Sequence, residues 1–337
     1  MRPRAWAAFA AVSVLWGIPY FLIKIAVAEV SPVFLAWARV LVGAAILLPL
    51  AWRTGALTGL RDRWRPTVAF ALVEIAGPFV LIPLGERWVS SSLAAILIAA
   101  VPLTVAVLAI RFVPDERPTG LRLAGLLVGL AGVVALLGID VAGRPLELLG
   151  AACILGATLG YAGGPIIAKA RLADLNPLGP VSASLVICSL VLLPPALLTM
   201  PDRVPSAGAL LALLGLGVLC TAAGLAIFFF LVADAGPSKA TVITYVSPTV
   251  AVALGVLILD ERIGAVAIAG MLLILAGSWL STGGRVPPGL AGAMARPFLG
   301  RSVRRPFSGR AGRSRTRWPR PRPDPGSPGG AESCPES

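Results

Sequence analysis

Long apolar runs separated by short polar loops fill most of this 337-residue chain. A helix needs about 20 mostly apolar residues to cross the roughly 30 Å hydrocarbon core of a bilayer. The runs are continuous rather than alternating, which favours spanning helices over barrel strands. The pattern predicts ten such helices, near residues 5–27, 31–52, 67–84, 89–110, 119–138, 147–168, 178–200, 207–233, 238–259 and 263–283.

The second half of the chain repeats the first at an offset of 145 residues. Asp115-Glu116-Arg117 returns as Asp260-Glu261-Arg262, and Lys24 returns as Lys169. Each repeat then holds five helices, and this odd number makes the second repeat enter the membrane from the opposite side. We therefore expect an all-α polytopic membrane protein with two inverted five-helix repeats, an arrangement typical of transporters with a site between the repeats.

The repeat and the loop charges predict the organisation of the chain. Residues 1–4 form the N-terminus, 5–138 the first repeat, 147–283 the second repeat and 285–337 a tail. If the N-terminus is cytoplasmic, the outer loops carry few basic residues, as the positive-inside rule requires. We expect a multi-pass protein of the inner (cytoplasmic) membrane with both termini cytoplasmic. The outer loops would then carry Arg87, Arg144, Arg203 and Arg262, and the inner ones Arg2, Arg4, Arg53, Arg61, Arg63, Arg65, Arg111, Arg117, Lys169, Arg171 and Lys239.

The tail from residue 285 onward differs in composition from the rest of the chain, because it is rich in Arg, Pro, Gly and Ser. It holds 11 Arg against three acidic residues and supplies +8 of the formal net charge of +13. Such a composition predicts disorder. Its simplest interpretation is an extension without a function of its own, and contact with anionic lipid headgroups is the alternative. No nucleic-acid partner is expected.

Composition argues against metal and hydrolytic chemistry. The chain is 57% hydrophobic and 13% charged, with no His, and its four Cys are scattered. It therefore lacks imidazole ligands, the commonest general base and any zinc spacing. We expect no metal, no cofactor and no enzymatic activity, and no feature predicts an oligomeric state.

A series of motifs identifies a family resemblance. The first helix contains Leu15-Trp16-Gly17-Ile18-Pro19-Tyr20 followed by Lys24, the fourth contains Pro102, and the turn Asp115-Glu116-Arg117 precedes the fifth. In this order the motifs resemble the EamA-type transporters of the drug/metabolite transporter (DMT) superfamily, over residues 8–138 and 148–283. The second copy departs from the pattern, with Gly160-Tyr161-Ala162-Gly163 where tryptophan-glycine is expected. The resemblance implies ten helices around a central cavity and transport of small metabolites, commonly export.

Two charged residues lie deep within predicted helices. Glu74 is near the middle of the third helix and Arg39 lies in the second, and each such charge costs at least about 2.5 kcal/mol at the membrane centre. Their repeat partners are Leu219 and Ser184, so neither charge belongs to the repeated framework. We expect either a structural Arg39–Glu74 pair or a ligand site, where an unpaired Glu74 could couple transport to protons or another ion.

Aromatic residues with polar tips accompany these charges at mid-membrane depth. Such side chains either line a cavity for an organic solute or fill the core. The predicted substrate-binding candidates are therefore Trp16, Tyr20, Arg39, Glu74, Tyr161 and Tyr245.

Prolines, glycines and the repeated polar residues complete the framework. Prolines interrupt helical hydrogen bonding and can create hinges, although membrane helices also tolerate them. Gly156, Gly160 and Gly164 form a stripe that we interpret as close packing. Lys24 and Lys169 are expected at helix ends, and the acidic turns as caps for the fifth and tenth helices. The helix-break and gating candidates are Pro19, Pro102, Pro165 and Pro248.

Together these patterns predict a secondary transporter. We expect two five-helix bundles to rock about a midplane site and to move a small organic metabolite, an amino acid or a related compound, in the direction of efflux. The alternatives are a nucleotide-sugar or drug carrier, for which phosphate would require several buried Arg or Lys, and a lipid-handling or scaffolding membrane protein. The scaffold alternative predicts a closed, uniformly packed interface between the repeats.

Overall fold

The computed structural model describes residues 3–112, 119–140, 143–235 and 242–281, and these residues form helices and no strand. Eight helical spans are long and apolar enough to cross a membrane, and two shorter apolar helices follow them. The expected all-α fold is confirmed. The predicted tail and the Asp115-Glu116-Arg117 turn lie outside the described residues.

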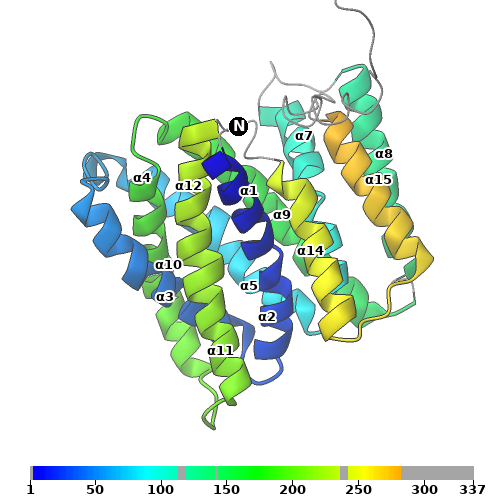
Figure 1. Ribbon diagram of the computed structural model, residues 1–337, viewed down its shortest axis with the longest axis horizontal. Coiled ribbons are helices and arrows are strands. Elements are labelled where there is room, and N and C mark those ends of the chain that lie inside the picture. The colour runs from blue at the N-terminus through cyan, green and yellow to red at the C-terminus, as the bar shows by residue number, and fades with distance from the viewer. Residues whose placement is uncertain (1–2, 113–118, 141–142, 236–241, 282–337) are drawn as a thin grey trace, which may run out of the picture. The chain divides into compact units, whose positions relative to one another are not determined.

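The first repeat combines one long helix, Pro32–Arg53, with shorter helical pieces (Figure 1). They are α1 (Pro3–Leu15), α2 (Ile18–Ala26), α3 (Pro32–Arg53), the 3₁₀ turn η1 (Arg61–Arg63), α4 (Trp64–Phe70), the π-helix η2 (Ala71–Ala76), α5 (Gly77–Glu86), α6 (Ser91–Ile98), α7 (Val101–Phe112), α8 (Leu121–Ala135) and the π-helix η4 (Leu136–Asp140).

The second repeat likewise combines long helices with shorter pieces. They are α9 (Pro145–Arg171), α10 (Leu178–Leu198), α11 (Ala207–Gly215), the π-helix η5 (Leu216–Ala223), α12 (Gly224–Ala235), α14 (Ile243–Ile258) and α15 (Ala265–Ser281).

Serine residues define several helix starts. Ser31 accepts a hydrogen bond from the Phe34 amide at 3.1 Å and is followed by Pro32, whose fixed backbone suits the first helical turn. Ser90 caps α6 and Ser206 caps α11 in the same way. These caps place the helix starts close to the ends of the predicted apolar runs.

The two repeats share a π-helical segment at equivalent positions. The segment Ala71–Ala76 in the first repeat corresponds, at the 145-residue offset, to the start of Leu216–Ala223 in the second. A π-helix carries an extra residue per turn and shifts the side chains that follow, and such segments are frequent at functional sites. In this protein they carry Glu74 and Thr221.

The four prolines predicted to break helices fall into two groups. Pro19 follows the interruption between α1 and α2, and Pro102 follows the interruption between α6 and α7. In contrast, α9 and α14 continue through Pro165 and Pro248, so the breaks expected there are not found. A proline removes only one backbone donor, and a membrane helix can continue past it as a kink.

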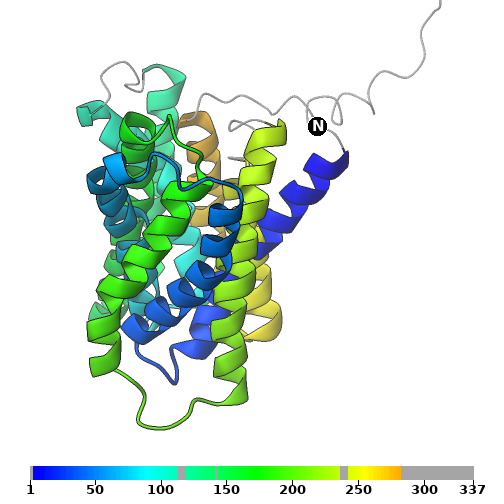
Figure 2. The same ribbon diagram turned by 90° about the vertical axis from the view of Figure 1, so that its left-hand side faces the viewer.

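The repeats are interlocked rather than arranged as two separate bundles (Figures 1 and 2). Helix α3 packs along α10, α5 along α9, and α8 along α15, and each pair joins one repeat to the other. The α1–α2 span packs against α11, α12 and α14 of the second repeat. The expected rocking of one five-helix bundle against the other therefore needs revision, because a moving body would have to combine helices from both repeats.

Candidate functional site

Arg39 is a buried cation that joins the two repeats. It lies on α3 and is 6% exposed, and its Nε donates a 2.8 Å hydrogen bond to Oγ1 of Thr221 in η5. Its guanidinium carbon lies 3.8 Å from the centroid of the Phe79 ring, a cation–π contact that stabilises the charge in an apolar setting. No hydrogen bond between described residues uses its two terminal nitrogens, which leaves them available to a ligand.

Glu74 lies in the π-helix η2 and packs directly against Gly164 of α9. The glycine makes room for the carboxylate, so this position of the glycine stripe does more than bring two helices together. One carboxylate oxygen is buried without a hydrogen-bond partner among the described residues. The Arg39–Glu74 ion pair that the sequence left open is not formed among the described residues, because Arg39 bonds to Thr221 instead.

Two tyrosines connect these charges. Tyr161 of α9 lies near both Arg39 and Glu74, and Tyr20 of α2 lies near Tyr161, Glu86 and Arg39. We call these four residues, Tyr20, Arg39, Glu74 and Tyr161, the central cluster. It combines one acidic, one basic and two phenolic groups on elements of both repeats, which is suited to a ligand that carries both charges.

The other two predicted site residues lie apart from the central cluster. Trp16 packs against Phe228 of α12, with ring centroids 4.8 Å apart, in a separate hydrophobic group. The hydroxyl of Tyr245 donates to the carbonyl of Ser278 on α15 at 3.3 Å. The structure thus brings four of the six candidates together.

The sequence did not predict Thr221 and Phe79 as site residues, although both contact Arg39. Thr221 is the repeat partner of Ala76, so comparison of the two repeats could have indicated an added hydroxyl at this level. Phe79 carries no comparable signal, because one more aromatic residue in an apolar helix is unremarkable.

Polar contacts join the two repeats at both ends of the helical assembly. At one end Glu29, before α3, accepts hydrogen bonds from the hydroxyl and the amide of Ser206 at the start of α11. These bonds, led by the hydroxyl, lower the pKa of the Glu29 carboxyl. At the other end Asp174, the repeat partner of Glu29, forms a 2.9 Å ion pair with Arg63. We call these the Glu29 contact and the Asp174 contact.

The acidic turn of the second repeat, Asp260-Glu261-Arg262, does not cap the tenth helix as expected. Glu261 accepts hydrogen bonds from the amides of Ser91 and Ser92 at 2.7 and 3.0 Å, and from the Ser92 hydroxyl. It therefore caps α6 of the first repeat rather than its own helix α15. Lys24 also differs, since its Nζ donates to the carbonyls of Glu86 and Val89 at 2.7 Å instead of extending towards the membrane surface.

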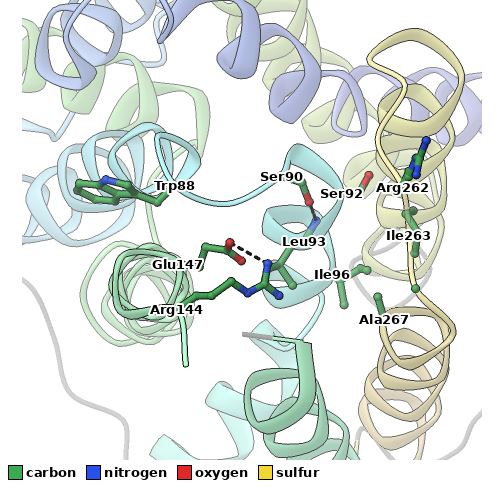
Figure 3. A pocket seen from close by; sticks show the side chains of 11 residues that line it. Trp88, Ser90, Ser92, Leu93, Ile96, Arg144, Glu147, Arg262, Ile263 and Ala267 are labelled. Carbon is green, nitrogen blue, oxygen red and sulfur yellow. Dashed lines mark hydrogen bonds and ion pairs between the residues drawn. The ribbon is translucent and has the colours of Figure 1, made fainter. Parts of the chain in front are cut away.

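A cavity of about 280 Å³ lies beside this turn and is separate from the central cluster (Figure 3). Arg144 and Glu147 form a 2.8 Å ion pair on its wall, and Arg262 and Ser92 line the opposite side. None of the six predicted site residues lines it. No group of three or more potential metal ligands occurs among the residues that the structure describes.

An all-helical membrane protein with two interlocked repeats and a charged cluster between them has the architecture of a transporter. The model of the EamA-like transporter family matches residues 4–138 and 148–283. The chain belongs to this family and is a multi-pass membrane transporter.

Relatives share this description. An "Uncharacterized transporter" of Archaeoglobus fulgidus is 26% identical over 82% of this chain and 98% of its own length. The "Uncharacterized inner membrane transporter YedA" of Escherichia coli (strain K12) is 27% identical over 74% of this chain and 81% of its own length. A "Probable amino-acid metabolite efflux pump" of the same strain is 25% identical over 81% and 93%, respectively.

A solved crystal structure shares the fold. It superposes with a TM-score of 0.60 over 88% of this chain and all of the other chain, at 19% sequence identity. This likeness shows the fold alone.

Proposed function

We propose that this transporter exports a small zwitterionic solute, an amino acid or a related metabolite, by alternating access through the central cluster. The observation that carries the proposal is the state of Arg39. Its terminal nitrogens have no partner among the described residues, and Tyr161 lies within electrostatic range of both Arg39 and Glu74.

The chemistry of the cluster supports a zwitterion. The guanidinium of Arg39 suits a carboxylate, which it can bind through two parallel hydrogen bonds. Glu74 suits an ammonium group, and Tyr20 and Tyr161 offer apolar rings with polar tips for the remaining part of the solute. The E. coli relative named as a probable amino-acid metabolite efflux pump agrees with this substrate class and with export.

The same cluster argues against the alternatives. A nucleotide-sugar carrier needs several buried cations for its phosphates, whereas Arg39 is the one fully buried basic side chain among the described residues. A scaffold gains no stability from buried polar atoms without partners, since each costs free energy. The oxygen of Glu74 is such an atom at the contact between the repeats.

The orientation follows from the loop charges. With both termini cytoplasmic, the Asp174 contact faces the cytoplasm and the Glu29 contact faces outward, because α3 and α10 cross the membrane between them. The relative YedA is named as an inner membrane transporter, which supports the same localisation for this protein.

Solute counterflow in proteoliposomes tests the proposal. The purified full chain is loaded with unlabelled amino acids and offered radiolabelled ones, alongside the matching amines without a carboxylate and acids without an amine. We expect accumulation of zwitterions and little of either single-charge analogue. Arg39→Lys should weaken transport less than Arg39→Met, because a lysine keeps the charge but not the planar fork.

Glu147→Gln is the matched control for these variants, because it removes a charge from a partly exposed ion pair away from the cluster and from both end contacts. It should leave the preference for zwitterions unchanged. Absence of counterflow for every small metabolite, or equal movement of amines and zwitterions, would contradict the proposal.

A further inference from the structure

Glu86, the last residue of α5, is a buried acid without a hydrogen-bond partner. It is 0% exposed, and both carboxylate oxygens are buried without a partner among the described residues. An ionised carboxylate in such surroundings costs far more free energy than a neutral one. The closed arrangement of this end of the protein therefore favours the protonated acid.

Lys24 lies beside Glu86 but does not neutralise its carboxylate by direct contact. The Nζ of Lys24 is committed to the backbone carbonyls of Glu86 and Val89, each at 2.7 Å. No ion pair among the described residues joins Lys24 to the carboxylate. Without direct contact, the Glu86 carboxylate is attracted by the charge of Lys24, repelled by Glu261 of the loop before α15 and attracted more weakly by Arg39 of α3.

The remaining elements packed against α5 supply no counter-charge in contact with Glu86. The segment η2 brings Glu74, which interacts with Tyr161, and α6 brings Ser91, whose hydroxyl is itself buried without a partner. No hydrogen bond or ion pair between described residues joins any neighbouring group to the carboxylate. These groups are Tyr20 on α2, Glu74 on η2, Ser91 on α6, the paired Arg144 and Glu147 at the start of α9, and the exposed Arg87, which follows Glu86 in the sequence.

Water can approach Glu86 from the end of the protein at which Lys24 lies. A cavity of about 200 Å³ lies there, lined by Lys24, Val27, Ala28, Glu86 and Arg87. It is large enough for several water molecules, each of which takes about 30 Å³ in the liquid. A proton can therefore reach the cavity that Glu86 borders, although the carboxylate oxygens themselves are buried in this arrangement.

The chain that connects α5 to α6 is clamped at both ends. Lys24 of the first repeat holds the carbonyls of Glu86 and Val89, and Glu261 of the second repeat holds the amides of Ser91 and Ser92. Movement between helices of the two repeats would release this clamp and admit water to Glu86. Hydration would then stabilise the ionised carboxylate.

We propose that Glu86 binds the coupling proton of this transporter, and that its protonation closes the end of the protein at which Lys24 lies. The inference rests on the transport function proposed above. It assigns the coupling to Glu86, whereas the sequence pointed to Glu74.

The proton balance follows from burial. In the open state Glu86 is a hydrated carboxylate; it accepts one proton from water at this end, becomes neutral and is buried as the end closes. The proton leaves to water on the opposite side when that side opens, and the carboxylate formed then favours reopening at the Lys24 end. With the orientation proposed above, one proton enters as the solute is exported.

Cysteine accessibility tests the proposal without knowledge of the solute. Val27→Cys places a half-buried thiol in the cavity beside Glu86, and Val204→Cys places one in an exposed loop at the same end, each in full chain whose native cysteines are replaced by serine. The probe is a membrane-impermeant maleimide, applied from about pH 5 to about pH 8, the range over which a partly buried carboxyl group titrates. The rate at position 27 is divided by the rate at position 204 to remove the intrinsic pH dependence of the thiol.

We expect this ratio to rise several-fold with pH when Glu86 is present, because ionisation opens the end. With Glu86→Gln the ratio should stay low at every pH, while Glu86→Asp should restore the rise and show that the variant chain folds. Glu147→Gln, which changes an ion-paired acid at the same end, should behave as the parent.

A rise that persists in Glu86→Gln, or that also disappears in Glu147→Gln, would overturn the assignment. Counterflow measured on the same preparations separates the two proposals. Counterflow without a pH response that depends on Glu86 would preserve the transport function and reject the coupling site. A pH response without any solute counterflow would reject the transport function and, with it, the coupling.

Discussion

Three glutamates of this protein occupy two different environments. Glu29 and Glu261 accept hydrogen bonds from amides at the starts of α11 and α6, where free N–H groups and the helix dipole stabilise a negative charge. Glu86 lies instead at the end of α5, without a hydrogen-bond partner for its carboxylate among the described residues. The first two acids therefore act as ionised contacts between the repeats, whereas the third favours its neutral form.

Glu261 should stabilise the fold in a pH-dependent way. Burial raises the pKa of its carboxyl group, but the hydrogen bonds from Ser92 and Ser91 outweigh burial and lower the pKa overall. Because the folded pKa lies below the unfolded one, the stabilisation is complete above the unfolded value of about 4.3 and is lost as the pH falls through the folded value. Glu261→Gln should lower the free energy of unfolding by about 1 kcal/mol at neutral pH.

Thermal unfolding in detergent, measured across the pH range, checks this prediction. The difference between the parent and Glu261→Gln should shrink as the pH falls below about 4. Glu147→Gln is a suitable control, since its carboxylate pairs with a side chain and caps no helix of the other repeat. A difference that grows in acid would contradict the assignment.

At the scale of elements, the contact between α8 and α15 depends on glycine on both helices. A Cβ atom on Gly277 would collide with the backbone of Gly129 and the carbonyl of Gly125. Gly277 is itself the repeat partner of Gly132, so each repeat brings the same glycine face to this contact. Small residues let membrane helices approach closely enough for extensive van der Waals contact.

Gly277→Ala should therefore destabilise the protein by about 1–3 kcal/mol, because the added methyl group has no space. Gly138→Ala is the matched control, since a Cβ there meets no atom within 4 Å. Thermal unfolding of both variants in detergent measures the effect. Equal midpoints for the two variants would show that the α8–α15 contact is looser than described.

The elements show what a single sequence can predict. Apolar runs located the helices because the bilayer sets their length and hydrophobicity. The π-helices at Ala71–Ala76 and Leu216–Ala223 carry no such pattern, since one additional residue in a turn leaves an apolar run apolar. Pro165 and Pro248 show a similar limit of sequence analysis. A proline indicates where a helix can be interrupted, but tertiary packing decides whether the interruption occurs.

Part of the central cluster could be recognised from the sequence. Arg39 and Glu74 could be recognised because a charge within an apolar run is unusual and neither charge recurs in the other repeat. Glu86 could not, because its role depends on contacts between segments distant in the chain, and Thr221 is indicated only by comparison with its repeat partner Ala76. Trp16 and Tyr245 share the expected membrane depth with the cluster but contact other helices, and depth alone cannot predict the direction of a side chain.

At the scale of the whole molecule, the inverted repeat places related contacts at opposite ends. The Glu29 contact and the Asp174 contact occupy equivalent positions in the two repeats, and α3 and α10 separate them. Both contacts are formed in the structure, so both ends are held at once. Alternating access then requires each contact to open in turn around the central cluster, with helices from both repeats moving together.

Reversible cross-linking of each end during counterflow measures this directly. A short thiol cross-linker would join Glu29→Cys to Ser206→Cys, or Arg63→Cys to Asp174→Cys, in full chain without native cysteines. We predict that either cross-link stops zwitterion counterflow and that reduction restores it, whereas the single-cysteine variants keep transporting. Counterflow that continues with either end cross-linked would contradict alternating access through the central cluster.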